Sequence, residues 1–548
     1  MPDIPARPSL EQYKKQAKDL LRACSARNLD ALDRIRRWHP RFRKAADDRI
    51  AAIVLADAQL VLAHEHGFPS WPKFAAHLET VNTLRALEDP SGAGLPDPES
   101  LFLQFASVPR HGWHASGTLD QANLILSRYP HVATASIYTA AVLGDAAGVA
   151  GFLGRDPALA TTPGGPNAWD ALTYLCFSRY LRLEPHRAFV DTARTLLEAG
   201  ASANTGWWEM LDEDPPRQVP EKAIYGTAGI ARHAGLTQLL LDYGADPNDE
   251  ETPYHVPETR DNTVLRILLD SGRFHEQSLA TVLARKADWH DDEGLLLALH
   301  AGANPNYLTV WKATPFQHAI RRDNGLVMIQ MLLDHGADPT IRNNVDHLNA
   351  FQMAAHHGRA DILAELENRG SAPQWDRPFD ALVATCARAD LARTQALIAA
   401  SPDLLPQLLQ ISPALLARFA GAGNLEGVRT LLDLGIPVDA PWPDGDPYWE
   451  LPRNSTALHV AAWRAHHDIV RELIARGANV NATDPRGRTP LQFAVRACTD
   501  SYWKDRRQPD SVAALLAAGA HQQGIRLPTG YDAIDRLLSE TETAASQT

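Results

Sequence analysis

The amino-acid sequence predicts an all-α solenoid in which about eleven helix-turn-helix repeats stack on one another through short hairpin loops. Three features predict this fold: glycines that recur about every 34 residues, an apolar triplet ahead of most of these glycines, and a Thr-containing tetrad that opens several repeats. A small helical domain is expected to precede the repeats.

The recurring glycines set the period. They are Gly302, Gly336 and Gly370, spaced by 34 residues, and the less regular copies Gly435, Gly477 and Gly519. A period near this length indicates an array in which each unit packs against its neighbours. Each glycine is expected just after a helix C-terminus, where a left-handed residue caps the last carbonyls.

Apolar residues lie seven, four and three positions before five of these glycines, and also before Gly272. Ahead of Gly336, for example, they are Ile329, Leu332 and Leu333. This i, i+3, i+4 spacing puts all three side chains on one face of a helix, which is typical of a buried face.

A second recurring tetrad opens several repeats, at residues 252–255, 314–317, 456–459 and 489–492. Its threonine fits a helix N-cap, and the proline that often follows fits the first helical position. Together with Ala461-Ala462 and the ending Gly477–Asn481, the tetrads resemble those of ankyrin repeats, and residues 455–482 are the best copy. The resemblance implies stacked helix pairs around an inner groove.

The chain divides into three predicted parts. Residues 1–88 form an amino-terminal helical domain or cap, 89–99 a linker, and 100–548 the ankyrin-repeat solenoid with an atypical first unit and a C-terminal cap. A capping box at Ser9 is expected to open a helix to about Ala26, followed by helices at 29–38, 46–66 and 70–88. Residues 67–79 resemble an amino-terminal region of bacterial ankyrin-repeat proteins.

Three insertions lengthen the repeat period: residues 207–220, 441–454 and 499–510. Insertions in a solenoid are expected as loops. They carry aromatic side chains such as Trp208 and Trp449, which either contact a partner or pack within their own loop. Pro257 lies where the first helix of its repeat should run, so we expect that helix to be short or kinked.

Composition favours a soluble, cytoplasmic protein with no membrane partner. The net charge is −13, although the first 50 residues hold 13 Lys or Arg against 7 Asp or Glu. The acidic bulk makes nucleic acid an unlikely partner. The four cysteines lie far apart, so we expect them to be reduced and buried.

Catalytic motifs are missing from the sequence, and we expect no catalytic residue, no metal and no cofactor, so the chain is not predicted to be an enzyme. The triplet His64-Glu65-His66 is the strongest metal candidate, but its two rings would not share one helix face. Solvation at a helix end is the simpler interpretation.

The sequence instead predicts a scaffold that binds another protein, of unknown identity, through its groove. Counting seven and eight residues from the first position of each tetrad gives Thr259/Arg260, Arg321/Arg322, His356/His357, Trp463/Arg464 and Arg496/Ala497. Of these, Arg321, Arg322, His356, His357, Trp463 and Arg464 are the predicted binding residues. The ankyrin resemblance implies that these residues face the inner groove, and Arg and Trp are favoured at binding hot spots. The alternative is that they are ordinary helix positions.

Two rival functions stay open. One is binding of nucleic acid or an acidic partner through the basic amino-terminal residues Arg34, Arg36, Arg37, Arg41, Arg43 and Lys44. The other is a metal-dependent enzyme hidden in degenerate repeats.

Overall fold

The computed structural model describes residues 9–545 except for 40–41, 43–46, 52, 67, 69, 72–73, 76–77, 79–96, 111–113, 115–116, 185–186, 212–215, 374 and 502. The chain forms two compact units, Met1–Ala245 and Asp246–Thr548.

The amino-terminal unit begins with α1 (Leu10–Ser25), α2 (Leu29–Trp38), α3 (Asp47–Ala51) and α4 (Leu55–Glu65). The predicted cap of α1 is confirmed, because the Ser9 hydroxyl accepts a hydrogen bond from the Gln12 amide. The apolar faces of these helices meet in one core that includes Leu20, Leu32 and Val61.

The single helix predicted over residues 46–66 is wrong. It divides into α3 and α4, because the Asp57 carboxylate accepts a hydrogen bond from the Val54 amide and starts α4 as a separate helix. Most of the helix predicted over 70–88, and residues 89–96 of the predicted linker, lie outside the described residues. The next described helix, α6 (Pro98–Ala106), is capped by Asp97.

The repeats of the amino-terminal unit follow α7 (Asp120–Arg128) and the 3-10 turn η2 (Pro130–Thr134). They are α8 (Ile137–Leu143) with α9 (Ala146–Leu153), α10 (Ala171–Cys176) with α12 (Phe189–Glu198), and α13 (Ala223–Tyr225), extended by η4 (Gly226–Ile230), with α14 (Ala234–Asp242). The short turn η3 (Pro157–Ala160) follows α9, and α11 (Arg179–Leu183) lies between α10 and α12.

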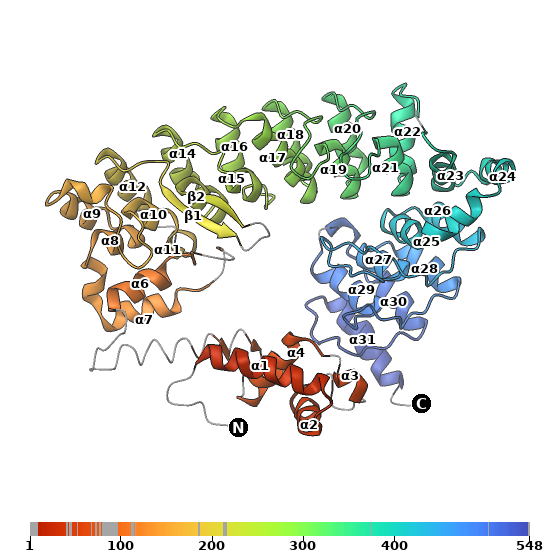
Figure 1. Cartoon of the computed structure of the whole chain (residues 1–548), viewed down its shortest axis with the longest axis horizontal. Helices are drawn as coiled ribbons and strands as arrows, with labels where there is room; N and C mark the ends of the chain where they lie inside the picture. The colour runs from red at the N-terminus through yellow and green to blue at the C-terminus, as the bar shows by residue number, and fades with distance from the viewer. Residues whose placement is uncertain are drawn as a thin grey trace. The chain divides into compact units, whose positions relative to one another are not determined.

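The first insertion folds as a β-hairpin and not as an irregular loop. Strand β1 (Gly206–Leu211) pairs antiparallel with β2 (Arg217–Lys222), and Figure 1 shows them as two arrows beside α14. Its side chains alternate between buried and exposed, as expected for a strand pair with one covered face. The sequence of residues 206–211 does not show this alternation, because Glu209 is on the buried face and Trp208 and Met210 are on the exposed face.

The carboxyl-terminal unit contains its own series of repeats (Figure 1). They are α15 (Glu251–His255) with α16 (Thr263–Asp270), α17 (Glu276–Asp288) with α18 (Asp292–His300), α19 (Pro315–Arg321) with α20 (Leu326–Asp334), α21 (Ala350–His356) with α22 (Ala360–Asn368), α23 (Pro378–Ala387) with α24 (Leu391–Ala400), α25 (Leu404–Gly421) with α26 (Leu425–Asp433), α27 (Ala457–Trp463) with α28 (His467–Ala475), and α29 (Pro490–Thr499) with α30 (Asp510–Ala517). The turn η5 (Lys504–Arg506) precedes α30, and α31 (Asp532–Ala545) ends the described chain. From α8 to α30 the described residues form eleven helix pairs, as predicted.

The helix boundaries follow the predicted signals. Thr314 and Thr489 cap their helices, and each makes a capping box with the glutamine three residues later. The six periodic glycines all have φ between 81° and 95°, where residues with a side chain are strained. The tetrad at residue 252 is an exception, because Thr252 lies inside α15. That helix spans only Glu251–His255, so the predicted shortening is confirmed.

The helices pack in two layers. The first helix of each repeat packs against the first helix of the next, in the order α15, α17, α19, α21, α23, α25, α27 and α29. The second helices do the same from α16 to α22 and from α26 to α30. Between the layers lie the predicted apolar residues, among them the fully buried Leu332, Leu431 and Leu473. The fold is therefore the all-α solenoid that the sequence predicts, with one added hairpin.

The array of the carboxyl-terminal unit curves so strongly that its late repeats reach its early ones. Arg464, which caps α27, donates a hydrogen bond to Asp323 beyond α19 at 3.0 Å. The hydroxyl of Tyr448, in the 441–454 insertion, donates to the Asp288 carbonyl at 3.4 Å. This insertion therefore lies across the inner side of the curve and occupies part of the groove.

Candidate functional site

Five of the predicted groove residues line one cavity of about 290 Å³ in the carboxyl-terminal unit: Arg321, Arg322, His356, His357 and Arg464. They come from the ends of α19, α21 and α27. Counting from the tetrads thus finds side chains that the solenoid brings together. Trp463 does not line this cavity.

The rest of the wall comes from residues that the count did not find. Arg418 reaches the cavity from α25, and Asp446 reaches it from the 441–454 insertion. Gly421 and Ala422, at the end of α25, also line it, and their small size leaves room there. The repeat of α25 has no Thr-containing tetrad from which to count, so the sequence offered no signal for Arg418.

Arg321 and Arg418 are the two cations whose charge is least compensated in this cavity. Among the described residues, Arg321 makes no hydrogen bond or ion pair within bonding distance, and Arg418 has only a contact of 4.0 Å to Asp444. Burial lowers the pKa of both guanidinium groups. The charge of Arg322 further lowers the pKa of Arg321, and the charge of Arg321 further lowers that of Arg418. Two half-buried guanidinium groups with free donors can bind an anion.

Arg322 and Arg464 are held in place by this chain itself. The Nε of Arg322 donates to Asp288 at 2.7 Å, and its guanidinium lies 3.6 Å from the ring centre of Tyr448. Arg464 lies 5.0 Å from the ring centre of Trp449 and is 5% exposed, and its burial lowers its pKa. Both cations therefore fix the insertion to the repeats.

The two histidines have different environments. His356 lies with Nε2 2.9 Å from the carboxylate of Asp380, at the start of the next repeat. Burial lowers the pKa of His357 well below its usual value, and the neighbouring arginines lower it further. His357 is therefore neutral and can offer only a neutral donor or acceptor to a ligand.

The three predicted tryptophans lie in different surroundings. Trp463 is 2% exposed and packs edge-on against Trp503, and Trp449 is 1% exposed. Trp208, on β1, is 61% exposed. Trp463, Arg464 and Trp449 are thus enclosed by the packing of this chain, whereas Trp208 is available on the surface. The predicted continuous ridge is interrupted at α27.

Two family models match the repeats. One, described as Ankyrin repeats (3 copies), matches residues 414–523, and the other, described as Ankyrin repeat, matches residues 311–344. The chain contains ankyrin repeats. Modules of this kind mediate protein–protein interactions, and both matched segments contribute to the arginine-lined cavity.

Similarity to curated proteins is local. Over 76 residues the chain is 40% identical to Serine/threonine-protein kinase 12 of Arabidopsis thaliana and 33% identical to Tyrosine-protein kinase Shark of Drosophila melanogaster. Each similarity covers 14% of this chain, and the chain spans only 15% and 7% of the two kinases. A solved structure, the human ASB11 ankyrin repeat domain, is 18% identical and covers 49% of this chain and 98% of its own, with a TM-score of 0.21.

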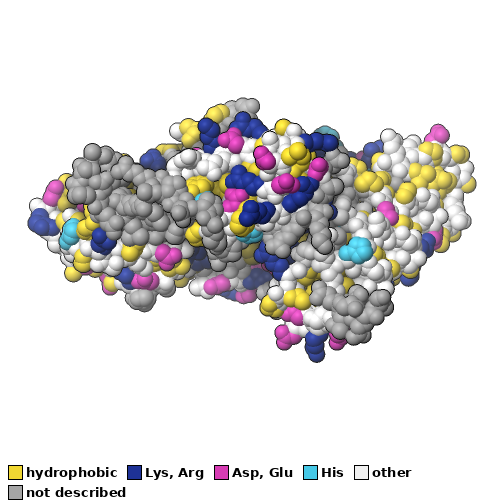
Figure 2. Space-filling model, turned by 90° about the horizontal axis from the view of Figure 1, so that it is seen from below, with side chains coloured by type: hydrophobic (Ala, Val, Ile, Leu, Met, Phe, Trp, Pro, Cys, Tyr) yellow, Lys and Arg dark blue, Asp and Glu magenta, His cyan; other side chains and the backbone are white. Residues whose placement is uncertain are grey.

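Outside the ankyrin repeats, the basic amino-terminal residues make contacts within their own domain. Arg34 binds the buried Glu65 at 2.5 Å, and Arg36 pairs with Asp33 and Asp47. Arg41, Arg43 and Lys44 lie outside the described residues. On the face of the molecule in Figure 2, basic and acidic side chains are interspersed.

The histidine triplet that we considered for metal has structural contacts. His64 Nδ1 lies 2.8 Å from the Trp38 carbonyl, Glu65 binds Arg34, and His66 stacks on Phe74. Each member of the triplet therefore serves the packing of α4. In the described part of the chain, no helix is long and apolar enough to cross a membrane.

Proposed function

We propose that this chain is a non-catalytic scaffold that binds an acidic segment of a partner protein in the cavity between α19, α21 and α25. An Asp or Glu side chain of the partner would lie between Arg321 and Arg418. Trp208 on the β-hairpin is a second, separate contact in this proposal. The partner's identity is not part of it.

The observation that carries the proposal is the pair Arg321 and Arg418. Keeping two cations close together and half-buried costs free energy, and their lowered pKa values reflect that cost. An incoming carboxylate offsets it, because it can accept two parallel N–H bonds from one guanidinium. Charged neighbours such as Asp346 and Asp446 supply only part of this compensation.

The cavity size fits an anchoring side chain. About 290 Å³ is at the lower end of the range for small-molecule pockets, so it accommodates one or two side chains of a larger ligand. Most of the partner would therefore lie outside the cavity. Rigid helix ends of the carboxyl-terminal unit form a preformed surface around the cavity, which lowers the ordering cost of binding.

The proposal is tested in the full-length protein by comparing wild type with the double variant Arg321→Gln/Arg418→Gln. The matched control is Arg266→Gln/Arg471→Gln, which removes two exposed arginines from second helices of the same unit. Proteins retained from a lysate of the source organism are quantified on each form. We expect the cavity variant to lose its partner by about 30-fold, the hot-spot threshold of about 2 kcal/mol, and the control to keep it.

A fluorescent octa-glutamate peptide gives a second measurement by anisotropy, with octa-glutamine as its control. Binding of octa-glutamate should weaken as salt rises and should disappear in the cavity variant. Equal retention of the same proteins by wild type and cavity variant would contradict the proposal, as would equal binding of the two peptides. Urea unfolding of each variant checks that the fold is intact.

A cytoplasmic location and the bacterial type of the amino-terminal region stay predictions from the sequence. The buried free cysteines are consistent with a reducing environment. The basic amino-terminal residues carry no competing proposal, because the described ones are paired within the domain.

A further inference from the structure

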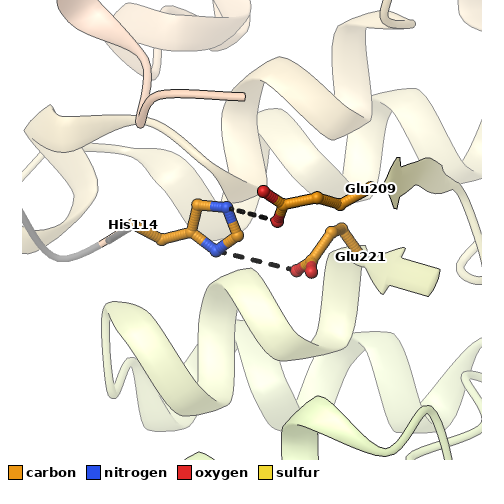
Figure 3. Close-up of side chains that lie close together, drawn as sticks. All are labelled: His114, Glu209 and Glu221. Atoms are coloured by element: carbon orange, nitrogen blue, oxygen red, sulfur yellow. Dashed lines mark ion pairs between the residues drawn. The ribbon is translucent and has the colours of Figure 1, made fainter. Parts of the chain in front are cut away.

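Three ionisable side chains of the amino-terminal unit converge beneath the β-hairpin (Figure 3). They are His114, Glu209 of β1 and Glu221 of β2, and all three are buried. His114 Nε2 lies 3.3 Å from a carboxylate oxygen of Glu209, and its Nδ1 lies 3.7 Å from one of Glu221. The sequence predicted no metal or cofactor here.

The hairpin register explains why both carboxylates point the same way. Trp207 pairs with Glu221 and Glu209 pairs with Val219, so these four side chains share the covered face. Alternate residues of a strand share a face. Glu209 therefore lies next to Trp207, the cross-strand partner of Glu221, and Glu221 lies next to Val219, the cross-strand partner of Glu209. The ring of His114 meets this face and packs edge-on against Trp207.

The three side chains form a ligand set whose formal charge matches that of a divalent cation. Two carboxylates, a neutral imidazole and a divalent cation are together neutral. One imidazole nitrogen with two carboxylate oxygens is a ligand set that zinc and similar divalent metals accept.

The geometry is close to that of a bound ion. One ligand atom from each residue lies within 4.8 Å of the other two. Ligand atoms at about 2.0 to 2.2 Å from a tetrahedral ion are about 3.3 to 3.6 Å apart. His114 and Glu209 already have this separation, and the widest pair would have to close by up to about 1.5 Å. We propose that His114, Glu209 and Glu221 bind one divalent cation of the zinc class, which fixes the β-hairpin to the segment before the repeats.

A second cluster of one histidine and two glutamates shows the alternative. His255 lies 3.1 Å from Glu251 and 3.0 Å from Glu258, and Glu258 also binds Arg285. Burial opposes the charged ring there, but the hydrogen bonds to the two glutamates raise the pKa of His255 to about 9. The imidazolium itself is the cation of that cluster, which makes it a matched control.

The proposed ion has a consequence for the outer face of the hairpin. Trp208 and Met210 alternate with the buried residues and are 61% and 51% exposed. An ion beneath the hairpin would hold these two apolar side chains in a fixed position at the surface. Its role is thus structural, and it does not depend on the arginine-lined cavity in the other unit.

Metal analysis of the full-length protein tests the site. Wild type and variants are stripped with chelator, equilibrated with Zn²⁺ alone, dialysed, and measured by inductively coupled plasma mass spectrometry. We expect about one zinc per chain for wild type and for the control Glu251→Gln, and less than about one fifth of that for Glu209→Gln and for Glu221→Gln, because each loses a charged ligand.

A second measurement needs no variant. Arg217 is exposed at the start of β2, so trypsin cleavage after it reports opening of the hairpin. Zinc should slow this cleavage in wild type and chelator should restore it. No zinc above the level of a non-binding protein, or equal zinc in wild type and Glu209→Gln, would overturn the proposal and leave an imidazolium between two glutamates, as at His255.

Discussion

Two insertions of similar composition differ in whether they expose or bury an aromatic side chain. The insertion at 207–220 forms a β-hairpin that presents Trp208 to solvent, 61% exposed. The insertion at 441–454 has no regular strands, and it buries Trp449 to 1% exposure. An aromatic residue in a solenoid insertion therefore does not by itself indicate a binding surface.

The difference comes from what each insertion packs against. The 441–454 insertion lies on the inner side of the curved array, where Arg322 covers the ring of Tyr448 and Arg464 and Trp503 lie against Trp449. The hairpin has one covered face, so alternate side chains must point away from the protein. Trp449 is therefore buried because its insertion lies inside the curved array, and Trp208 is exposed because of the alternation of side chains along β1.

The 441–454 insertion also reduces the space in the groove. A groove that the chain partly fills with its own insertion leaves a smaller space for a partner. One space that remains is the cavity between Arg321 and Arg418, and its wall includes Asp446 of the same insertion. The insertion is thus part of the proposed binding site and not merely its competitor.

The largest expected effect on stability within the 441–454 insertion is that of Trp449→Ala. Removing a fully buried indole leaves a cavity among packed groups, so we expect the free energy of unfolding to fall by about 3 to 5 kcal/mol. Urea unfolding followed by circular dichroism measures it. A cost below about 1 kcal/mol would mean that the insertion lies open in solution and that the groove is free.

A pH effect of intermediate size is expected at the same insertion. The ring of His290 lies 5.9 Å from that of Trp449. Burial lowers the pKa of His290 to about 4. The charges of Arg464, Arg506 and Arg260 also lower this pKa, whereas that of Asp323 raises it. Because the folded pKa lies below the unfolded value of about 6.5, the stabilisation is complete above pH 6.5 and is lost as pH falls toward 4.

The measurement compares wild type with His290→Asn between pH 7.5 and pH 5. Other buried histidines such as His466 titrate in the same direction, so only the difference between the two proteins reports His290. We expect wild type to lose on the order of 1 to 2 kcal/mol more than the variant over this range. Parallel pH profiles would show that water reaches the ring and that the insertion is loosely packed.

Much of this fold is legible in the sequence because repeat architecture is encoded locally. Leu332 is buried and Gly336 has a φ of 85°, as the spacing of the apolar triplet and the glycine predicts. Thr314 caps α19 as its tetrad predicts. These features depend on residues within one repeat, and a local pattern is enough to predict them.

The candidate sites were only partly predictable, since they depend on contacts between distant segments. The tetrad count placed Arg321 at the cavity, but Arg418 comes from a repeat without a tetrad. Whether Arg464 faces solvent depends on the curvature that brings Asp323 to it, which no single repeat encodes. His114 and Glu209 are likewise joined only by the folded hairpin.

The smallest expected effect on stability is that of Trp208→Ala, and its neighbour supplies the control. Trp208 is exposed, so its removal should change the free energy of unfolding by no more than about 0.5 kcal/mol. Trp207 is buried and stacks on Trp169 with ring centres 4.3 Å apart, so Trp207→Ala should cost roughly 3 to 5 kcal/mol. Urea unfolding of both variants measures the contrast. If the two variants lose similar stability, Trp208 is covered in solution, and the hairpin would then resemble the 441–454 insertion in serving the packing of its own chain.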